Sequence, residues 1–402
     1  MDSYARTITA AQLAEGVAGI PTVTATATVV DPVLIVDLDG ADESLAALAA
    51  ARVAVLDQLV IGRSSRPILP ALAPLTAALD LTYAPLTTPR GEEFSVRGDG
   101  PARPTHRAGL DPGHDAEPVP GPRRGPLVQA EQESTARDRA VVGVADVDVA
   151  TAEFVTAVAR NPQAASIAGQ VLRISDTLSI PQAIDVESLA YSTLQGGAEF
   201  RRWLEDRRRL GRPLPPPPTA DPVLIDRGGD TLHITLNRPE RRNAYGTAVR
   251  DALVVALHVA LVDDTVTEVV LAGAGPCFCA GGDLDEFGHA PDHVTAHFIR
   301  TRGGAARLMA RLAHRMRVDV HGQCVGAGIE VPAFARRIVA APDTVFRLPE
   351  VGMGLIPGAG GTVSLPRRIG RWRALHLFVT GAELDAYRAR EWGLVDQVID
   401  PA

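Results

Sequence analysis

The apolar positions of this chain divide it into two folded stretches with a polar stretch between them. Before residue 90, continuous apolar runs typical of buried strands alternate with Ala/Leu patterns typical of helices. This alternation predicts a small α/β segment over residues 1–90. Its predicted elements are strands at 29–38 and 53–61 and helices at 43–51 and 70–79.

Residues 91–140 interrupt this order. Pro, Gly, Arg and Asp dominate there, and the few apolar residues follow no period. Such a stretch cannot bury enough apolar surface to offset the entropy of folding, so we expect a flexible linker.

Periodic apolar positions resume after the linker and predict a helical segment over residues 141–212. A Pro-rich spacer follows at 213–221, in which no helix can continue. The predicted elements of the helical segment are a short strand at 141–144 and helices at 149–160, 163–175 and 185–209.

From residue 222 onward strands and helices alternate again, which predicts a second α/β unit over residues 222–402. The glycine pair Gly228-Gly229 indicates a hairpin turn, and the apolar positions of Thr247–Val262 repeat at a helical period. Further predicted elements are strands at 268–272 and 318–321 and helices at 292–316 and 327–335.

Composition and charge exclude several classes of protein. The 402 residues include 40 basic and 48 acidic ones, a net charge of −8, which argues against nucleic-acid binding. The N-terminus lacks the pattern of a secretory signal, and no apolar run is long enough to span a bilayer. The three cysteines suggest no disulfide framework, and Cys277-Phe-Cys279 lacks the spacing and the matching pair of a zinc knuckle. We therefore expect a cytoplasmic protein without a metal site or a membrane partner.

Two acids beside glycine-rich backbone carry the candidate chemistry. Glu350 precedes Val351-Gly-Met-Gly-Leu-Ile-Pro-Gly-Ala-Gly-Gly361, and Glu330 ends Val325-Gly-Ala-Gly-Ile-Glu330. Small residues let backbone N–H groups approach a reacting oxygen closely. Two carboxylates next to such amides predict proton transfer beside a stabilised oxyanion.

Four motifs follow one another in the C-terminal half. They are Leu236-Asn-Arg-Pro-Glu-Arg-Arg-Asn-Ala244, Gly275-Pro-Cys-Phe-Cys-Ala-Gly-Gly-Asp-Leu284, Val320-His-Gly-Gln-Cys-Val-Gly-Ala-Gly-Ile-Glu330 and Leu348-Pro-Glu-Val-Gly-Met-Gly-Leu-Ile-Pro-Gly-Ala-Gly-Gly-Thr362. Together with Trp392-Gly-Leu-Val-Asp396, they make residues 222–402 resemble the crotonase superfamily, also called the enoyl-CoA hydratase/isomerase family. The resemblance implies an α/β fold with a crotonase-like spiral of ββα units in the C-terminal half.

The resemblance also implies an acyl-CoA substrate and a site built around Glu330 and Glu350. In relatives that hydrate an α,β-unsaturated acyl-CoA, two matching glutamates hold one water, and the sequence leaves open which is the base and which the proton donor. The backbone N–H groups of Gly282 and Ala327 would hold the thioester oxygen. Coenzyme A is expected only as part of the substrate, with no covalently bound cofactor. The residues expected to bind CoA or the acyl group are Arg242, Ala244, Ala280, Gly281, Asp283, Leu284, Phe287, Pro357 and Gly358.

The expected protein is an acyl-CoA lyase, an enoyl-CoA hydratase of fatty acid metabolism that forms a homotrimer or homohexamer. The alternatives are an enoyl-CoA isomerase that uses one glutamate, and a non-catalytic acyl-CoA-binding or assembly subunit. Two features depart from the family pattern, namely Pro332 after Glu330 and Arg347-Leu348 before Glu350. Residues 285–317 contain nothing that specifies the acyl group.

Relatives continue past the last motif with helices that cover the site, and residues 141–212 resemble those helices. We therefore expect a helical cap that precedes the core it covers. Either a circular permutation or a tandem with a degenerate first copy, at residues 1–90, would give this order. Helices that contact the core are a requirement of this hypothesis, and deletion of residues 1–140 would then leave a foldable protein.

Overall fold

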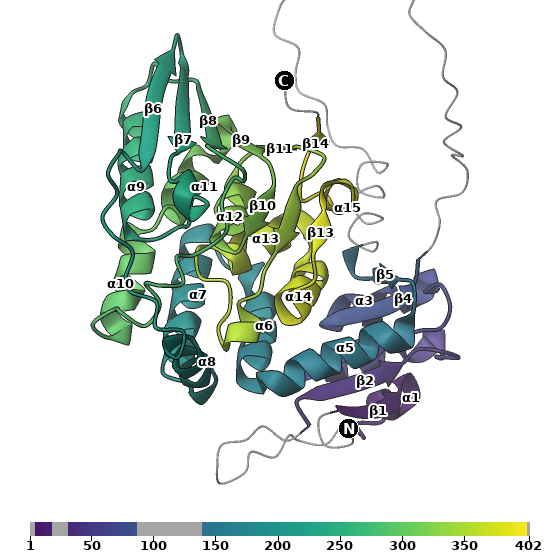
Figure 1. Ribbon diagram of the computed structural model, residues 1–402. Helices are drawn as coiled ribbons and strands as arrows, with labels where there is room; N and C mark the ends of the chain where they lie inside the picture. Colours follow the sequence, from purple (N-terminus) through teal and green to yellow (C-terminus); the bar gives the residue numbers. More distant parts are fainter. Residues whose placement is uncertain (1–4, 18–30, 87–138, 400–402) are drawn as a thin grey trace, which may run out of the picture.

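The computed structural model describes residues 5–17, 31–86 and 139–399, in which sheets and helices alternate (Figure 1). The predicted α/β class is confirmed. The predicted linker, up to residue 138, lies outside the described residues, as do residues 29 and 30 of the first predicted strand.

A five-stranded parallel sheet forms the N-terminal part, with its strands in the chain order β1-β2-β3-β4-β5. The strand predicted at 53–61 is wrong at its start, because helix α2 continues to Val53 and β3 begins at Leu59. The elements are β1 (Ala5–Thr9), α1 (Ala10–Ala14), β2 (Val33–Asp37), η1 (Glu43–Leu45), α2 (Ala46–Val53), β3 (Leu59–Arg63), η2 (Pro70–Leu72), α3 (Ala73–Ala78), β4 (Leu81–Pro85) and β5 (Val142–Val144).

Both faces of this sheet are buried, which explains why its strands are continuous apolar runs. On one face, Leu13, Leu34 and Leu75 belong to an apolar cluster formed with α1, α2 and α3. The other face contributes Ile61 and Tyr83 to the main core of the molecule. The N-terminal sheet is therefore packed against the rest of the chain.

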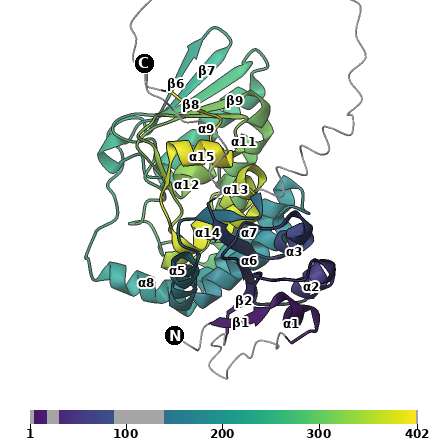
Figure 2. The same cartoon turned by 90° about the vertical axis from the view of Figure 1, so that its right-hand side faces the viewer.

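Four helices follow β5: the first packs on strand β4 of the N-terminal sheet, and the fourth lies away from that sheet (Figure 2). The single helix predicted at 185–209 is wrong, because the chain breaks at Gly196 and Gly197. The second of the four packs on α13 (Gly361–Ile369) and α14 (Arg371–Thr380). The third packs on α10 (His293–Gly303), α11 (Ala306–Leu312) and α13. These helices are α5 (Val147–Arg160), α6 (Pro162–Ser175), α7 (Ile180–Gln195) and α8 (Ala198–Arg208).

The C-terminal part contains a six-stranded sheet of order β14-β11-β9-β8-β7-β6 and a three-stranded sheet of order β10-β12-β13. In the larger sheet only the hairpin β6–β7 is antiparallel. The strands are β6 (Val223–Gly228), β7 (Thr231–Leu236), β8 (Glu268–Gly273), β9 (Met316–Val320), β10 (Gln323–Val325), β11 (Arg337–Ala340), β12 (Val345–Arg347), β13 (Leu384–Asp385) and β14 (Gln397–Val398). The helices are η3 (Pro239–Arg241), α9 (Thr247–Val262), α10 (His293–Gly303), α11 (Ala306–Leu312), η4 (Ala313–Arg315), α12 (Ala327–Glu330), η5 (Pro332–Phe334), η6 (Val351–Met353), α13 (Gly361–Ile369), α14 (Arg371–Thr380) and α15 (Ala386–Trp392).

Two helices of this part are shorter than predicted. The helix expected at 292–316 is divided into α10 and α11 at Gly304, whose backbone is extended. The helix expected at 327–335 is the single turn α12, because Pro332 lacks an N–H and opens the 3₁₀ turn η5. The dipole of so short a helix adds little to the amide of Ala327.

A buried carboxylate joins the N-terminal sheet to the helices packed against it. Asp80 accepts a hydrogen bond from the amide of Val60 at 2.8 Å and two from the guanidinium of Arg173, in α6, at 2.8 and 2.5 Å. Next to it, the indole N–H of Trp372, in α14, donates to the carbonyl of Leu79 at 2.9 Å. Such buried polar contacts hold the parts in one relative orientation.

Candidate active site

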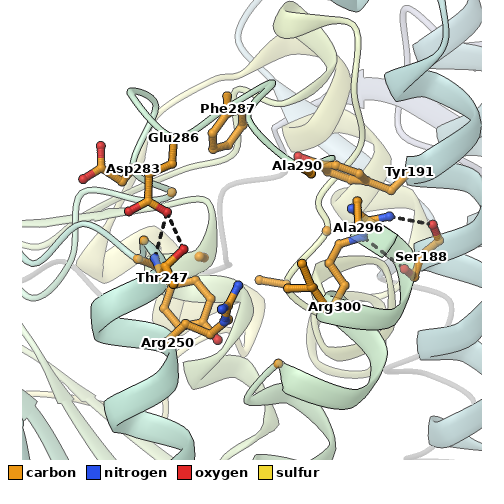
Figure 3. A pocket seen from close by; sticks show the side chains of 18 of the residues that line it. Ser188, Tyr191, Thr247, Arg250, Asp283, Glu286, Phe287, Ala290, Ala296 and Arg300 are labelled. Atoms are coloured by element: carbon orange, nitrogen blue, oxygen red, sulfur yellow. Dashed lines mark hydrogen bonds between the residues drawn. The ribbon is translucent and has the colours of Figure 1, made fainter. Parts of the chain in front are cut away.

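A cavity of about 560 Å³ lies between the helices that follow β5 and the C-terminal part. Helix α7 and the Pro-rich spacer supply part of its lining, including Tyr191 and Pro215. Figure 3 shows Thr247 and Glu286 on one wall and Tyr191 and Arg300 on the opposite wall. Both the segment that precedes residue 222 and the C-terminal part therefore contribute to the lining of the cavity.

The structure brings seven of the thirteen predicted site residues into the lining of this cavity, and the other six lie outside it. The lining residues are Gly282, Asp283, Phe287, Ala327, Glu330, Glu350 and Gly358. The predicted residues outside the lining are Arg242, Ala244, Ala280, Gly281, Leu284 and Pro357.

Glu330 ends the single turn α12 and is almost completely buried. Its Oε2 atom accepts hydrogen bonds from the amides of Ala359 at 2.7 Å and Gly361 at 3.0 Å. A Cβ at Gly361 would lie 2.7 Å from Glu330 Cγ, so only glycine lets the backbone come this close. The glycine-rich turn therefore holds the Glu330 carboxylate.

Glu350 faces the same cavity but has fewer partners. Its Oε2 atom is buried and has no hydrogen-bond partner among the described residues. A Cβ at Gly326 would collide with Glu350 Oε1 and would lie 3.8 Å from Glu330 Oε1. Both carboxylates therefore point toward the backbone of Gly326, and an unpartnered oxygen remains available for a molecule in the cavity.

Burial raises the pKa of each of these acids. Desolvation is the largest cause for Glu330, whose pKa is raised further by the charges of Glu350 and Glu187 and lowered by its two backbone hydrogen bonds. Desolvation, with a further contribution from Glu187, raises the pKa of Glu350 to about 8. A carboxyl group that titrates near neutral pH can both accept and donate a proton.

The segments that carry Gly282 and Ala327 lie side by side. The amide of Val325 donates to the carbonyl of Cys279 at 3.1 Å, and a Cβ at Gly281 would lie 2.9 Å from the carbonyl oxygen of Val325. Gly282 and Ala327 both line the cavity, and neither amide donates to another described residue. Two neighbouring free N–H groups can stabilise a developing oxyanion.

The loop after Gly282 is fixed by arginines. The Nε and Nη2 atoms of Arg241 donate to the Asp283 carboxylate at 2.9 and 2.6 Å, so this carboxylate is already paired. Arg207, from α8, donates to the carbonyl of Leu284 at 2.9 Å. The helices that precede the core thus support the loop that carries one of the two amides.

A third buried acid, Glu187, was not among the predicted site residues. It lies on α7, lines the cavity and is 2% exposed, and desolvation raises its pKa to about 7. The sequence does contain a signal for it, since Ile184, Tyr191 and Leu194 form a buried stripe at helical spacing that includes Glu187. An acid on such a buried stripe is either part of an ion pair or part of a functional site.

Arg300, in α10, was also not predicted. Its guanidinium lies 4.4 Å above the ring of Tyr191 and donates to the hydroxyl of Ser188 at 3.0 Å and to the side chain of Gln195 at 3.1 Å. Its positive charge favours the ionised form of Glu187 and so lowers the pKa of that carboxyl. Among the described residues no group of three or more His, Cys, Asp or Glu is arranged to hold a metal ion.

Comparison with known proteins identifies relatives of the C-terminal half. The sequence profile described as "Enoyl-CoA hydratase/isomerase" matches residues 227–402. The chain is 38% identical over 181 residues to 1,2-epoxyphenylacetyl-CoA isomerase of Escherichia coli (strain K12), covering 44% of this chain and 68% of the relative. It is 35% identical over 179 residues to 2,3-dehydroadipyl-CoA hydratase of the same organism, covering 44% and 68%.

A solved structure of an enoyl-CoA hydratase from Mycobacterium smegmatis is 34% identical and gives a TM-score of 0.42, covering 45% of this chain and 71% of the other. In the part of this chain that the structure describes, no helix is both long and apolar enough to cross a membrane.

Proposed function

The chain belongs to the enoyl-CoA hydratase/isomerase family, and on this premise we propose that this enzyme adds water across the double bond of a 2-enoyl-CoA thioester. The observation that carries the proposal is the pair of buried glutamates, Glu330 and Glu350, that face one cavity beside two free amides. Hydration needs a base for the water and an acid for the α-carbon, and the pair can supply both.

Glu330 is proposed as the base. Its carboxylate accepts two backbone hydrogen bonds, from Ala359 and Gly361, and such bonds favour the ionised form. Burial raises the pKa of both glutamates, so the hydrogen bonds decide the assignment: Glu350 is proposed as the acid, because no donor to its Oε2 atom favours the ionised form. The like charges of neighbouring carboxylates favour a state in which one of them retains a proton.

The proposed reaction begins when Glu330 takes a proton from the water, whose oxygen forms a bond to the β-carbon. The π electrons of the double bond move toward the thioester carbonyl and form an enolate, and the acid proton of Glu350 then passes to the α-carbon. Glu330 ends protonated and Glu350 ionised, and the proton returns between them before the next turnover. The water supplies the hydroxyl group of the 3-hydroxyacyl product, and the proton that it gives to Glu330 replaces the one that Glu350 has lost.

The enolate oxygen would be held by the amides of Gly282 and Ala327. These donors are part of the backbone and are already oriented, so little reorganisation is needed when the charge develops. The CoA portion is expected along the loops that carry Arg242, Ala244 and residues 280–284, and the acyl group beside Phe287. We also propose that helices α5–α8 act as the cap of this core, since α7 and α8 supply cavity residues.

The test is hydration of short and medium 2-enoyl-CoA substrates by the wild type, Glu330→Gln and Glu350→Gln. Each substitution keeps the shape of the side chain and removes the acid, so each should lower kcat by about 10²- to 10⁴-fold. Wild-type kcat in both variants would refute the mechanism.

The same assay separates the hydratase from an enoyl-CoA isomerase, the other activity that the family description names. An isomerase would convert a 3-enoyl-CoA to the 2-enoyl-CoA without hydrating the latter. It would also retain most of its activity in one of the two variants, because a single glutamate can move the proton between carbons.

A further inference from the structure

Helix α7, which precedes the core in the sequence, places a third carboxylate against the glycine-rich turn that holds Glu330. The Oε1 atom of Glu187 accepts the amide of Gly360 at 2.8 Å, and its Oε2 atom accepts the amide and the hydroxyl of Thr362, both at 2.8 Å. Three donors are therefore directed at one carboxylate that is almost completely buried.

The amides of this turn alternate between the two glutamates. Those of Ala359 and Gly361 donate to Glu330, and those of Gly360 and Thr362 donate to Glu187. Successive N–H groups of the turn thus point to opposite carboxylates, so a shift of the turn relative to one carboxylate also moves it relative to the other.

We propose that Glu187 is a positioning residue for Glu330: by binding alternate amides of the turn it fixes the amides that hold the catalytic carboxylate. This inference rests on the proposed hydratase function and adds to it a residue from the N-terminal half of the chain. The catalytic base is thereby held from two sides, by its own helix α12 and by a turn that α7 fixes in place.

The energetic cost of this arrangement argues for a role beyond folding. A buried carboxylate is costly, and this one also lies near two other acids. A neutral amide in its place would not repel Glu330 and Glu350, but it would offer the three donors of the turn one acceptor oxygen instead of two. The charge of Glu187 disfavours ionisation of both, so it helps to keep a proton within the pair.

The groups that act on Glu187 come from several elements. Glu330 and Glu350 face it from α12 and from the start of η6, Tyr191 lies one turn along α7, and Arg300 supplies the positive charge from α10. Replacing Glu187 with Gln removes a negative charge from this set and leaves Arg300 in place. The protons of Glu330 and Glu350 should then dissociate at lower pH.

The experiment compares the full chain with Glu187→Gln and Glu187→Asp. Glu187→Gln should lower kcat roughly 10- to 100-fold, with KM changed much less, because Glu330 is misplaced while the binding surface remains. The pH at which kcat declines on the alkaline limb of the pH profile should be lower by about one pH unit. Glu187→Asp keeps the charge and should recover the position of that limb, even where kcat stays reduced.

Glu199→Gln is the matched control. Glu199 is a buried glutamate in α8 that accepts two backbone hydrogen bonds, from Gln163 at 2.8 Å and Ala164 at 3.0 Å, but it does not bind the turn. Its variant should keep the wild-type kcat and pH profile. Wild-type kcat and an unmoved pH limb in Glu187→Gln would overturn the proposal.

An infrared titration makes the result independent of hydratase activity. The carbonyl band of a protonated buried carboxyl, assigned by its loss in Glu350→Gln, should disappear at lower pH in Glu187→Gln than in the wild type. If the wild type hydrates no enoyl-CoA but the band shifts, the proposed reaction fails and the coupling of Glu187 stands. If the wild type is active and the band does not shift, the role of Glu187 fails alone.

Glu187→Asp serves as a second variant if Glu187→Gln does not fold. The same titration of Glu187→Asp must then show the band at its wild-type position, and a displaced band would contradict the proposal.

Discussion

The hydroxyl oxygen of Tyr83 lies 2.8 Å from Nδ1 of His376, in a hydrogen bond that joins strand β4 to helix α14. The two rings meet edge to face with their centroids 5.7 Å apart, and Tyr83 is fully buried. The N-terminal sheet is therefore attached to the core by a specific polar contact as well as by apolar packing.

Deletion of residues 1–140 should produce a chain that aggregates. The hypothesis drawn from the sequence was that the remainder would fold, but the deletion removes Asp80 and Tyr83 and exposes the apolar sides of α6 and α14. Size-exclusion chromatography and soluble yield, compared with the full chain, measure the effect. A monodisperse fragment with the helical content expected for residues 141–402 would contradict this prediction.

Asp80→Ala should destabilise the protein by about 3–5 kcal/mol, because it removes a buried carboxylate and leaves the half-buried guanidinium of Arg173 and the amide of Val60 without their acceptor. Urea unfolding measures the change in the free energy of unfolding. The control is Asp148→Ala, which removes an exposed ion pair with Arg63 and should cost less than about 1 kcal/mol. Equal midpoints for the two variants would show that the buried pair is not a structural anchor.

His376 should make stability depend on pH below neutrality. Burial, with a smaller effect of Arg388, lowers its pKa to about 4, whereas the unfolded chain keeps a value near 6.5. The unfolded state therefore binds the proton first, and stability is lost as pH falls from about 6.5 to about 4, by at most about 3 kcal/mol. His376→Gln should flatten this part of the curve, measured as the difference between variant and wild type at each pH. An unchanged slope would exclude His376 as its source.

Gly326→Ala should strongly lower the proposed hydratase activity. Gly326 has φ +50° and ψ −121°, a conformation that residues with a Cβ rarely adopt, and a Cβ there would displace Glu350 Oε1. The expected loss in kcat is at least about 10²-fold. Gly352→Ala is the matched control, since a Cβ at that exposed position meets nothing within 4 Å. Comparable activity in the two variants would contradict the close approach of Glu350 to this backbone.

The wild-type kcat should decline as pH rises through about 8. Desolvation raises the pKa of Glu350 to about 8, and only its protonated form can donate to the α-carbon. Activity is therefore expected below that value and lost above it. A kcat that stays constant to pH 10, with the protein still folded, would exclude Glu350 as the acid.

Much of the site could be predicted because its parts are local. Glu330 with its neighbouring glycines, and Glu350 with Gly354 and Gly360, each occupy one short stretch whose backbone geometry is set by residues adjacent in sequence. The α/β class follows from patterns of similarly short range. The helix expected at 327–335 is only one turn long, because Pro332 lacks the N–H that would continue it, and this signal too is local.

The sequence by itself determined the α/β class, the family and the two acids, because each of these depends on short motifs and local periodicity. Only the tertiary structure decided that β5 joins the N-terminal sheet, that this sheet is attached to α14, and that Glu187 lies against the glycine-rich turn that holds Glu330. Glu187 and Gly360 are 173 residues apart in the sequence. Packing of apolar faces brings them together, and no local pattern records which faces will meet.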